Sequence, residues 1–198
     1  RYHHGDLRAA LIAASDELLA EHGLAGFSLR EAARRAGVSA AAPAHHFGDA
    51  AGLLSEVAAL GFRELSAQLD IGGGGATPLQ RLRLQGVAYV RFALRHPGRF
   101  QLMFRRELLS PDHAGLQEAG ARALEQLTAT VRAIRGLAPD APLAADDRAV
   151  LLGAWATVHG FAHLALDGKL ADLSGVAAQT DLLDTVLPQM LLAQWPDR

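Results

Sequence analysis

The sequence contains 198 residues, of which half are hydrophobic, and its formal net charge is −2 at pH 7. A chain of this length buries a sizeable core, and the absence of cysteine excludes disulfides and thiolate metal sites. The polar start lacks the apolar core of a secretory signal, and no apolar run is expected to span a membrane. We therefore expect a cytoplasmic, soluble protein with no membrane partner, and the charge gives no electrostatic indication of nucleic-acid binding.

Apolar residues recur with helical spacing along nearly the whole chain. In the first segment Asp6 is placed to cap a helix and Gly23 to end it. The apolar stripe between them is formed by Leu7, Leu11, Ala14 and Leu18. This spacing predicts an amphipathic first helix.

Two short helices follow the first. Ser28 and Glu31 have the spacing at which each side chain bonds the free backbone N–H of the other, so they predict the start of the second helix. Gly37 ends that helix. Ser39 is expected to cap a third helix over residues 40–46, which tolerates Pro43 because the proline lies near its first turn.

The rest of the chain also favours helices. A fourth helix is expected from about residue 49 to 69, and the glycine-rich residues 71–78 form a flexible loop. The later helices are expected over about 79–95, 98–106, 114–136, 144–167 and 180–195. No strand pattern occurs. The sequence therefore predicts an all-α fold with a three-helix head, residues 1–50, and a larger helical body, residues 51–198.

The second and third helices have the pattern of a helix-turn-helix. Gly37 supplies the backbone conformation of the sharp turn, and Ala33 is small enough to let the two helices approach. Val38 fills the space between them. In such a unit the second helix of the pair enters the major groove of DNA. From these residues alone, a helical hairpin without a DNA-binding role is the alternative.

Longer stretches of the sequence resemble the TetR family. In the head they are Tyr2-His3-His4-Gly5-Asp6-Leu7, Gly26-Phe27-Ser28-Leu29-Arg30-Glu31-Ala32-Ala33, Ala36-Gly37-Val38-Ser39 and His46-Phe47. In the body they are His96-Pro97-Gly98-Arg99-Phe100 through Phe104 and Trp155-Ala156-Thr157-Val158-His159-Gly160, which resemble a TetR C-terminal domain with a Trp-His-Gly signature. The resemblance implies a ligand-responsive repressor that binds a palindromic operator in double-stranded DNA. It also implies a homodimer that pairs through the last two helices.

The resemblance assigns the DNA contacts to the start of the second helix and to the third helix. The residues are Ser28, Arg30, Ser39, Ala40, Ala41, Ala42, His45 and His46. Arg30 can form a bidentate contact to guanine, or it can be a solvated surface charge. Ser28 suits a phosphate near a helix start, or it acts only as a cap. Tyr2, His3 and His4 form either an arm against the DNA backbone or a frayed end.

The sequence departs from the family at two positions of the head. Ala44 stands where the family usually has a tyrosine, and Ala50 stands where it usually has a lysine. The resemblance implies that both missing side chains contact DNA. We therefore expect modest affinity and a shallow salt dependence of DNA binding.

In the body, the resemblance implies an effector pocket whose ligand shifts the fourth helix. The candidate lining residues are Phe92, Phe100, Met103, Phe104, Leu127, Val131, Trp155 and His159. Each of them is also compatible with a plain core position. Residues of this kind suit a largely apolar small-molecule effector, whose identity the sequence does not give.

Two polar patterns in the body have alternative explanations. His159, His163 and Asp167 share one helix face, which is compatible with a metal site, but no further ligand is evident, so pocket or interface histidines are expected instead. Arg91, Arg95 and Arg99 share one stripe that could receive an anionic effector, lie near DNA phosphate or form a solvated face.

Enzymatic function is not expected. The sequence shows no nucleophile–base arrangement, phosphate loop or paired-carboxylate motif, and we expect no cofactor and no metal. The alternative to a repressor is a helical ligand- or protein-binding dimer whose DNA-binding head has decayed, and Ala44 and Ala50 are the residues that favour it.

Overall fold

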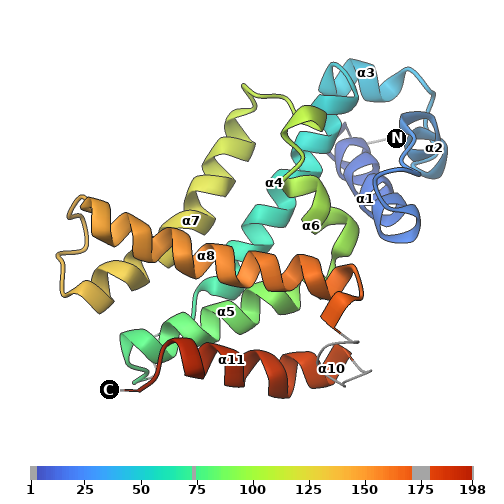
Figure 1. Ribbon diagram of the computed structural model, residues 1–198. Helices are drawn as coiled ribbons and strands as arrows, with labels where there is room; N and C mark the ends of the chain where they lie inside the picture. Colours follow the sequence, from blue (N-terminus) through green and yellow to red (C-terminus); the bar gives the residue numbers. More distant parts are fainter. Residues whose placement is uncertain (1–3, 73–74, 171–178, 198) are drawn as a thin grey trace. The chain divides into compact units, whose positions relative to one another are not determined.

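The computed structural model describes residues 4–72, 75–170 and 179–197 (Figure 1). Every regular element within these ranges is helical, which confirms the all-α prediction. The chain divides into two compact units, one formed by residues 1–64 and 96–121 and the other by residues 65–95 and 122–198. These units interleave along the chain. The expected functional boundary at residue 50 stays a prediction.

The first unit begins with the helices of the expected head. They are α1 (His4–His22), α2 (Leu29–Arg35) and α3 (Ala42–Phe47), and they are followed by α4 (Ala50–Leu69), whose last residues belong to the second unit. Gly23 ends α1 with a φ of +63°, as predicted. The cap assigned to Asp6 is wrong, because α1 already begins at His4 and the backbone of Asp6 lies inside the helix. The predicted arm of residues 2 and 3 lies outside the described residues.

The end of α2 has the hydrogen bonds of a Schellman motif. The N–H of Val38 donates to the carbonyl of Ala33 at 3.0 Å, and the N–H of Gly37 donates to the carbonyl of Arg34 at 3.1 Å. Gly37 has a φ of +70°, a conformation that residues with a side chain rarely adopt. The glycine turn of the helix-turn-helix therefore forms as predicted.

The start of α3 differs from the prediction. Ser39 does not cap the helix: its carbonyl accepts the N–H of Ala42 at 3.0 Å in a separate turn, and α3 begins only at Ala42. Pro43 lies in the first turn of α3, where its missing N–H is tolerated. At the start of α4, the carboxylate of Asp49 accepts the N–H of Gly52 at 2.8 Å.

A small apolar core joins the head helices. Its centre is formed by Leu11 of α1, Ala33 of α2 and Leu53 of α4, all of them fully buried or nearly so. Partly buried residues surround this centre: Leu7, Ile12, Leu29, Ala36, Val38 and Phe47. Ala33 and Val38 therefore have the packing roles that the helix-turn-helix pattern predicts.

A fifth helix, α6 (Pro97–Met103), completes the first unit by packing on α1 and α4. Gly98 approaches α1 so closely that a Cβ atom at this position would lie 2.1 Å from the carbonyl oxygen of Leu19. The next residue, Arg99, is only 7% exposed, and its guanidinium group bonds the carboxylates of Asp16 on α1 and Glu64 on α4. Burial opposes the charge on Arg99, but hydrogen bonds and Coulomb attraction from the two carboxylates hold its pKa above the usual value.

We expect Arg99→Met to lower the free energy of unfolding by about 3 kcal/mol, because it removes the cation that lies between two carboxylates. This is the low end for breaking a buried ion pair, since Glu64 is over a third exposed and can rehydrate. Urea denaturation measures the change. The control Arg63→Met removes an exposed arginine of α4 and is expected to leave stability within about 0.5 kcal/mol. Equal losses in both variants would contradict a role for the Arg99 contacts.

The second unit is a helical body built around α5 (Pro78–Arg95). Thr77 and Gln80 cap this helix reciprocally, with N···O distances of 3.0 and 3.2 Å. Its other long helices are α7 (Ala114–Arg135), which starts in the first unit, and α8 (Ala145–Leu166). The short helix between α6 and α7 is a 3₁₀ turn, η1 (Arg106–Leu108), which belongs to the first unit.

The C-terminal helix of the body is α11 (Leu187–Gln194), which lies beside α5 in Figure 1. It continues α10 (Gln179–Asp181) through η2 (Leu182–Val186), a π-helical segment. The widened turn precedes Pro188, which has no N–H to donate to the turn before it. A helix over 180–195 was predicted, but this local widening was not. The middle of the glycine-rich loop, residues 73 and 74, lies outside the described residues.

The expectation that no apolar run is long enough to span a membrane is wrong. Residues 149–166 contain no Asp, Glu, Lys or Arg, and α8 is long and apolar enough, by length and composition only, to cross a membrane. In the structure α8 packs on α5, where Val158 lies close to Gly86. The hydroxyl of Thr157 on α8 also accepts a hydrogen bond from Gln194 of α11 at 3.2 Å. These contacts are those of a helix in a folded body.

Candidate nucleic-acid interface

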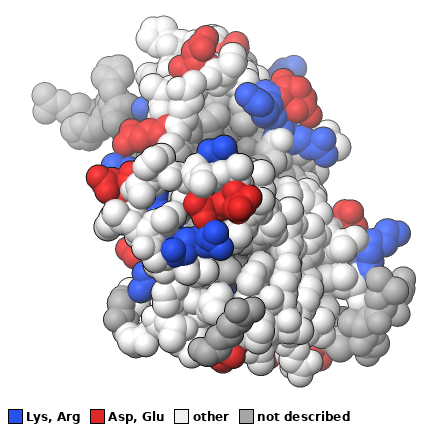
Figure 2. Space-filling model, turned by 60° about the vertical axis from the view of Figure 1, so that its left-hand side comes forward, with Lys and Arg blue, Asp and Glu red and all other residues white. Residues whose placement is uncertain are grey.

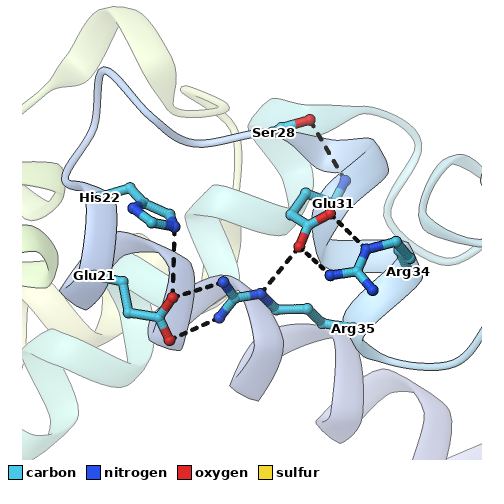
Figure 3. Close-up of polar contacts among 6 residues, drawn as sticks. All are labelled: Glu21, His22, Ser28, Glu31, Arg34 and Arg35. Carbon is cyan, nitrogen blue, oxygen red and sulfur yellow. Dashed lines mark hydrogen bonds and ion pairs between the residues drawn. The ribbon is translucent and has the colours of Figure 1, made fainter.

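The proposed DNA-binding surface lies at the start of α2 and on α3. Ser28 is the N-cap of α2, and its hydroxyl accepts the N–H of Glu31 at 3.4 Å (Figure 3). Within the described residues, the N–H of Ser28 does not donate the expected second bond to the carboxylate of Glu31. The carboxylate of Glu31 instead binds two arginines of its own helix.

Carboxylates bind the guanidinium groups of Arg34 and Arg35, so neither group is free to bind a ligand. Arg34 donates two bonds to Glu31, at 2.7 and 2.6 Å, and Arg35 donates two to Glu21 of α1, at 2.8 and 2.6 Å (Figure 3). Arg35 also reaches Glu31 at 3.3 Å. The hydrogen bonds from Arg34 lower the pKa of Glu31 to about 2. The stability that Glu31 contributes is therefore full above pH 4.5 and is lost as the pH falls towards 2.

Arg30 differs from these neighbours. It is exposed near the start of α2, and among the residues that the structure describes it has no carboxylate partner. Arg8, by contrast, is bonded to Glu56 and lies over the ring of Phe47, with its Cζ atom 5.3 Å from the ring centroid. Arg30 is thus the cation of the helix-turn-helix that can reach a ligand without first breaking an ion pair.

The predicted contact residues of the turn and α3 share one surface stretch. Ser39, Ala40, Ala41 and His45 are exposed, whereas Ala42 and His46 are half-buried. The rings of His45 and His46 meet edge to face with centroids 5.3 Å apart. Ala44 is exposed and Ala50 is half-buried at the first position of α4, so both substituted positions adjoin this stretch. Which of these residues contact DNA stays a prediction.

The charges of the chain do not indicate a strongly basic protein. On the face in Figure 2, basic and acidic side chains lie side by side, and most of the surface is uncharged. This arrangement agrees with a formal net charge of −2 and with the ion pairs of α2. Long-range attraction of DNA is therefore expected to be weak, and local contacts must supply the affinity.

The eight residues expected to line an effector pocket are divided between the two units. Phe100, Met103 and Phe104 belong to the first unit, where the rings of Phe100 and Phe104 have centroids 5.2 Å apart. The other candidates belong to the second unit: Phe92, Leu127, Val131, Trp155 and His159. Phe92, Phe100 and Val131 are fully buried, which also fits the core alternative. Their role as effector contacts is untested.

The candidates of the second unit include a hydrogen-bonded cluster between α5 and α8. The hydroxyl of Tyr89 lies 2.8 Å from Nδ1 of His159, and the indole N–H of Trp155 donates to the same hydroxyl at 3.3 Å. Burial raises the pKa of Tyr89. Burial and the charge of nearby His163 lower the pKa of His159, so this imidazole is neutral at pH 7.

The structure shows where the residues of the two polar patterns of the body lie. The rings of His159 and His163 have centroids 4.6 Å apart, but the described residues contain no group of three or more potential metal-ligating side chains. The proposed arginine stripe is wrong for Arg99, which is buried between Asp16 and Glu64 instead of sharing a surface with Arg91 and Arg95. Sequence spacing missed its role, because its partners lie 83 and 35 residues away.

Comparisons with known proteins agree with this architecture. The family model described as Bacterial regulatory proteins, tetR family, matches residues 11–57, and Tetracyclin repressor-like, C-terminal domain, matches residues 82–189. No curated protein matches the chain. The Trp-His-Gly subtype stays a prediction.

Similar solved structures cover three quarters or more of the chain. A Rhodococcus sp. RHA1 protein with unknown function is 33% identical and has a TM-score of 0.76, with 99% of this chain and 98% of that chain covered. The TetR family transcriptional regulator PfmR from Thermus thermophilus is 26% identical, with a TM-score of 0.54 over 75% of this chain and 84% of that chain. A TetR variant from Acinetobacter baumannii AYE, solved with minocycline, shares the fold at 18% identity, with a TM-score of 0.61 and 98% and 94% covered.

The C-terminal family model alone spans more than half of the chain, and the N-terminal model covers the helix-turn-helix described above. The chain therefore belongs to the tetR family of bacterial regulatory proteins and is a DNA-binding regulator.

Proposed function

We propose that this chain is a cytoplasmic, ligand-responsive repressor that binds a palindromic operator as a homodimer and catalyses no reaction. The observation that carries the proposal is the pairing of α2 and α3 across the Gly37 turn, with Arg30 exposed and without a carboxylate partner among the described residues. In a helix-turn-helix, α3 enters the major groove while α2 crosses the backbone. An exposed cation at the start of α2 then lies at the edge of the groove.

The exposed apolar surface of the second unit supports the homodimer. On α8, Leu152 and Leu164 are 58% and 46% exposed, and the added Cβ atoms of Gly153 and Gly160 would meet nothing within 4 Å. On α11, Leu192 is 45% exposed. Exposed leucines beside open glycines allow another helix to approach closely, and burying them stabilises an interface. In a two-fold dimer formed through α8 and α11, the partner subunit buries these exposed leucines.

The Arg30→Ala variant tests the DNA-binding role. A bidentate contact from Arg30 to guanine contributes about 1–3 kcal/mol per subunit, so its loss from both subunits is expected to weaken operator binding at least about 30-fold and to relax the preference at one base of each half-site. Fluorescence anisotropy with operator DNA and with its single-base variants measures both effects. The control Arg63→Ala removes an exposed arginine of α4, outside α2, α3 and the proposed dimer helices, and should leave affinity unchanged. Unchanged binding by Arg30→Ala would contradict the assigned contact.

Glu31→Gln is expected to steepen the salt dependence of DNA binding. The change removes the carboxylate that accepts both bonds from Arg34, whose side chain is already 72% exposed. If the released arginine neutralises one phosphate per subunit, the slope of log K against log salt changes by about −0.9 per subunit. Sequence preference should not change, because phosphate contacts carry no base information.

The matched control for this prediction is Glu17→Gln, which removes the same charge from an exposed position of α1. It is expected to change the slope by much less, since no arginine of the described residues is bonded to Glu17. Equal slopes in the two variants would show that only overall charge matters and that the ion pair with Arg34 does not restrain DNA binding.

A second candidate function is a dimer that binds a ligand or protein without binding DNA. It is favoured by one specific observation: the head offers few free cations, because Arg34 and Arg35 are bonded to carboxylates and alanines occupy positions 44 and 50. Failure of the wild-type chain to bind any DNA of its own control region at low salt would favour this candidate over the repressor.

A further inference from the structure

Two buried polar atoms of the body lack hydrogen-bond partners within the described part of the chain, and they belong to neighbouring turns of one helix. They are Nε of Arg81 and Oε1 of Gln85, both on α5. Another buried side-chain nitrogen, Nε2 of His96, differs from them because it lies 3.2 Å from a carboxylate oxygen of Glu64. Residues four apart on a helix face the same side, with Cβ atoms about 6 Å apart.

The orientation of the Gln85 amide is fixed by its surroundings. Its NH₂ group donates to the carbonyl of Leu69 at the end of α4, at 3.0 Å, and to the carbonyl of Gln126 on α7, at 3.3 Å. Turning the amide over would place its oxygen against two carbonyl oxygens, so this orientation is the only one with hydrogen bonds. Gln85 is 4% exposed, and its oxygen therefore remains an acceptor without a donor among the described residues.

A buried acceptor without a donor lowers stability by about 1–3 kcal/mol, and a buried N–H group without an acceptor has a similar effect. A protein that keeps both on neighbouring turns of one helix needs a compensating group. The group must accept from Arg81 and donate to Gln85. A hydroxyl does both with one oxygen atom, whereas an ether, a ketone or a hydrocarbon does not.

Other buried residues of α5 near this pair in sequence are apolar or aromatic. Leu82 and Val90 of α5 are buried, and Tyr89 continues the row Arg81–Gln85–Tyr89 at intervals of four residues. The hydroxyl of Tyr89 is already bonded to His159 and Trp155. In this row, the buried side-chain atoms without a hydrogen-bond partner among the described residues are therefore Nε of Arg81 and Oε1 of Gln85.

We infer that Arg81 and Gln85 form the polar end of the effector site and receive the hydroxyl group of an otherwise apolar molecule. This inference rests on the proposed ligand-responsive function and specifies the chemical class of its ligand. The alcohol oxygen accepts the Nε–H of Arg81, and its hydrogen is donated to Oε1 of Gln85. Its hydrocarbon part lies among apolar side chains of the body.

The test compares straight-chain alcohols with ethers of the same length. Thermal unfolding of the full-length wild-type protein is followed with 1-octanol, 1-decanol or 1-dodecanol, and with the methyl ether that has the same number of heavy atoms. At a concentration about tenfold above the dissociation constant, a bound alcohol is expected to raise the midpoint by about 3 °C. The ether accepts from Arg81 but cannot donate to Gln85, so its affinity should be at least about tenfold lower.

Gln85→Met removes the acceptor with little change in side-chain length and is expected to abolish the difference between alcohol and ether. The control Gln126→Met alters a side chain on α7 but keeps the main-chain carbonyl that Gln85 contacts, so the difference should persist. Equal shifts by alcohol and ether in the wild type, no shift by any of the three alcohols, or an unchanged preference in Gln85→Met would overturn the inference. The alcohol–ether comparison uses only the wild type and remains decisive if Gln85→Met does not fold.

DNA binding is measured on the same wild-type preparation. If the protein binds DNA and the alcohols fail, the inference about the hydroxyl is wrong and the repressor proposal stands. If the alcohols bind selectively and no DNA is bound, the repressor proposal fails and the ligand class stands.

Discussion

Replacing Gly98 by alanine is expected to destabilise the first unit by about 3–5 kcal/mol. The new Cβ atom would lie 2.1 Å from the carbonyl oxygen and 2.6 Å from the carbonyl carbon of Leu19, and backbone atoms of α1 cannot rotate away as a side chain does. To relieve the overlap, α6 must move outward from α1. That movement also weakens the bonds between Arg99 and Asp16, which depend on the same close approach.

The measurement is urea denaturation of the wild type and two alanine variants. Gly120→Ala is the matched control, because Gly120 also lies inside a helix, α7, but a Cβ atom there would meet nothing within 4 Å. This control should be neutral or should stabilise the protein by up to about 1 kcal/mol, as alanine favours the helix. A Gly98→Ala variant as stable as Gly120→Ala would contradict the close packing of α6 on α1.

Leu152→Glu is expected to convert the homodimer into monomers and, with it, to abolish tight operator binding. Leu152 is 58% exposed in the single chain, so the substitution leaves the monomer core intact. In a two-fold interface formed by α8, each subunit would bury a carboxylate in place of an apolar side chain. A combined loss of at least about 4 kcal/mol weakens dimerisation about a thousandfold.

Sedimentation velocity at micromolar concentration measures the oligomeric state. The control is Leu124→Glu on α7, since Leu124 is 45% exposed in the same unit but lies outside α8 and α11. It is expected to leave the dimer intact. A dimeric Leu152→Glu, or equal dissociation by both variants, would place the interface elsewhere.

Sequence signals that involve residues close to one another in the chain predicted most helix boundaries correctly. Ser28 and Gly37 mark the start and end of α2 because caps and glycine turns depend on hydrogen bonds between residues that are close in sequence. Ser39 shows the limit of this reasoning. A serine before a helical segment can cap it or precede a separate turn, and the turn that joins Ser39 to Ala42 is the conformation found.

The side-chain contacts between residues far apart in the sequence were less predictable. Sequence spacing places Arg99 on one helix face with Arg95. Its bonds to Asp16 and Glu64, however, depend on how α6 packs against two helices that are distant in the sequence. The bond from Arg34 to Glu31 is different, since a spacing of three residues on one helix is a sufficient signal for it. The free acceptor of Gln85 has no sequence signal, because it results from two main-chain carbonyls that fix the amide.

The central claim is that this chain binds a palindromic operator as a dimer through α2 and α3. Footprinting with the purified protein on the DNA that flanks its own gene tests it most directly. We expect protection of a palindrome whose half-sites lie on one face of the duplex, with centres about 34–36 Å apart or a multiple of that distance. Absence of any protected site at low salt would contradict the account and favour a ligand- or protein-binding dimer with a decayed head.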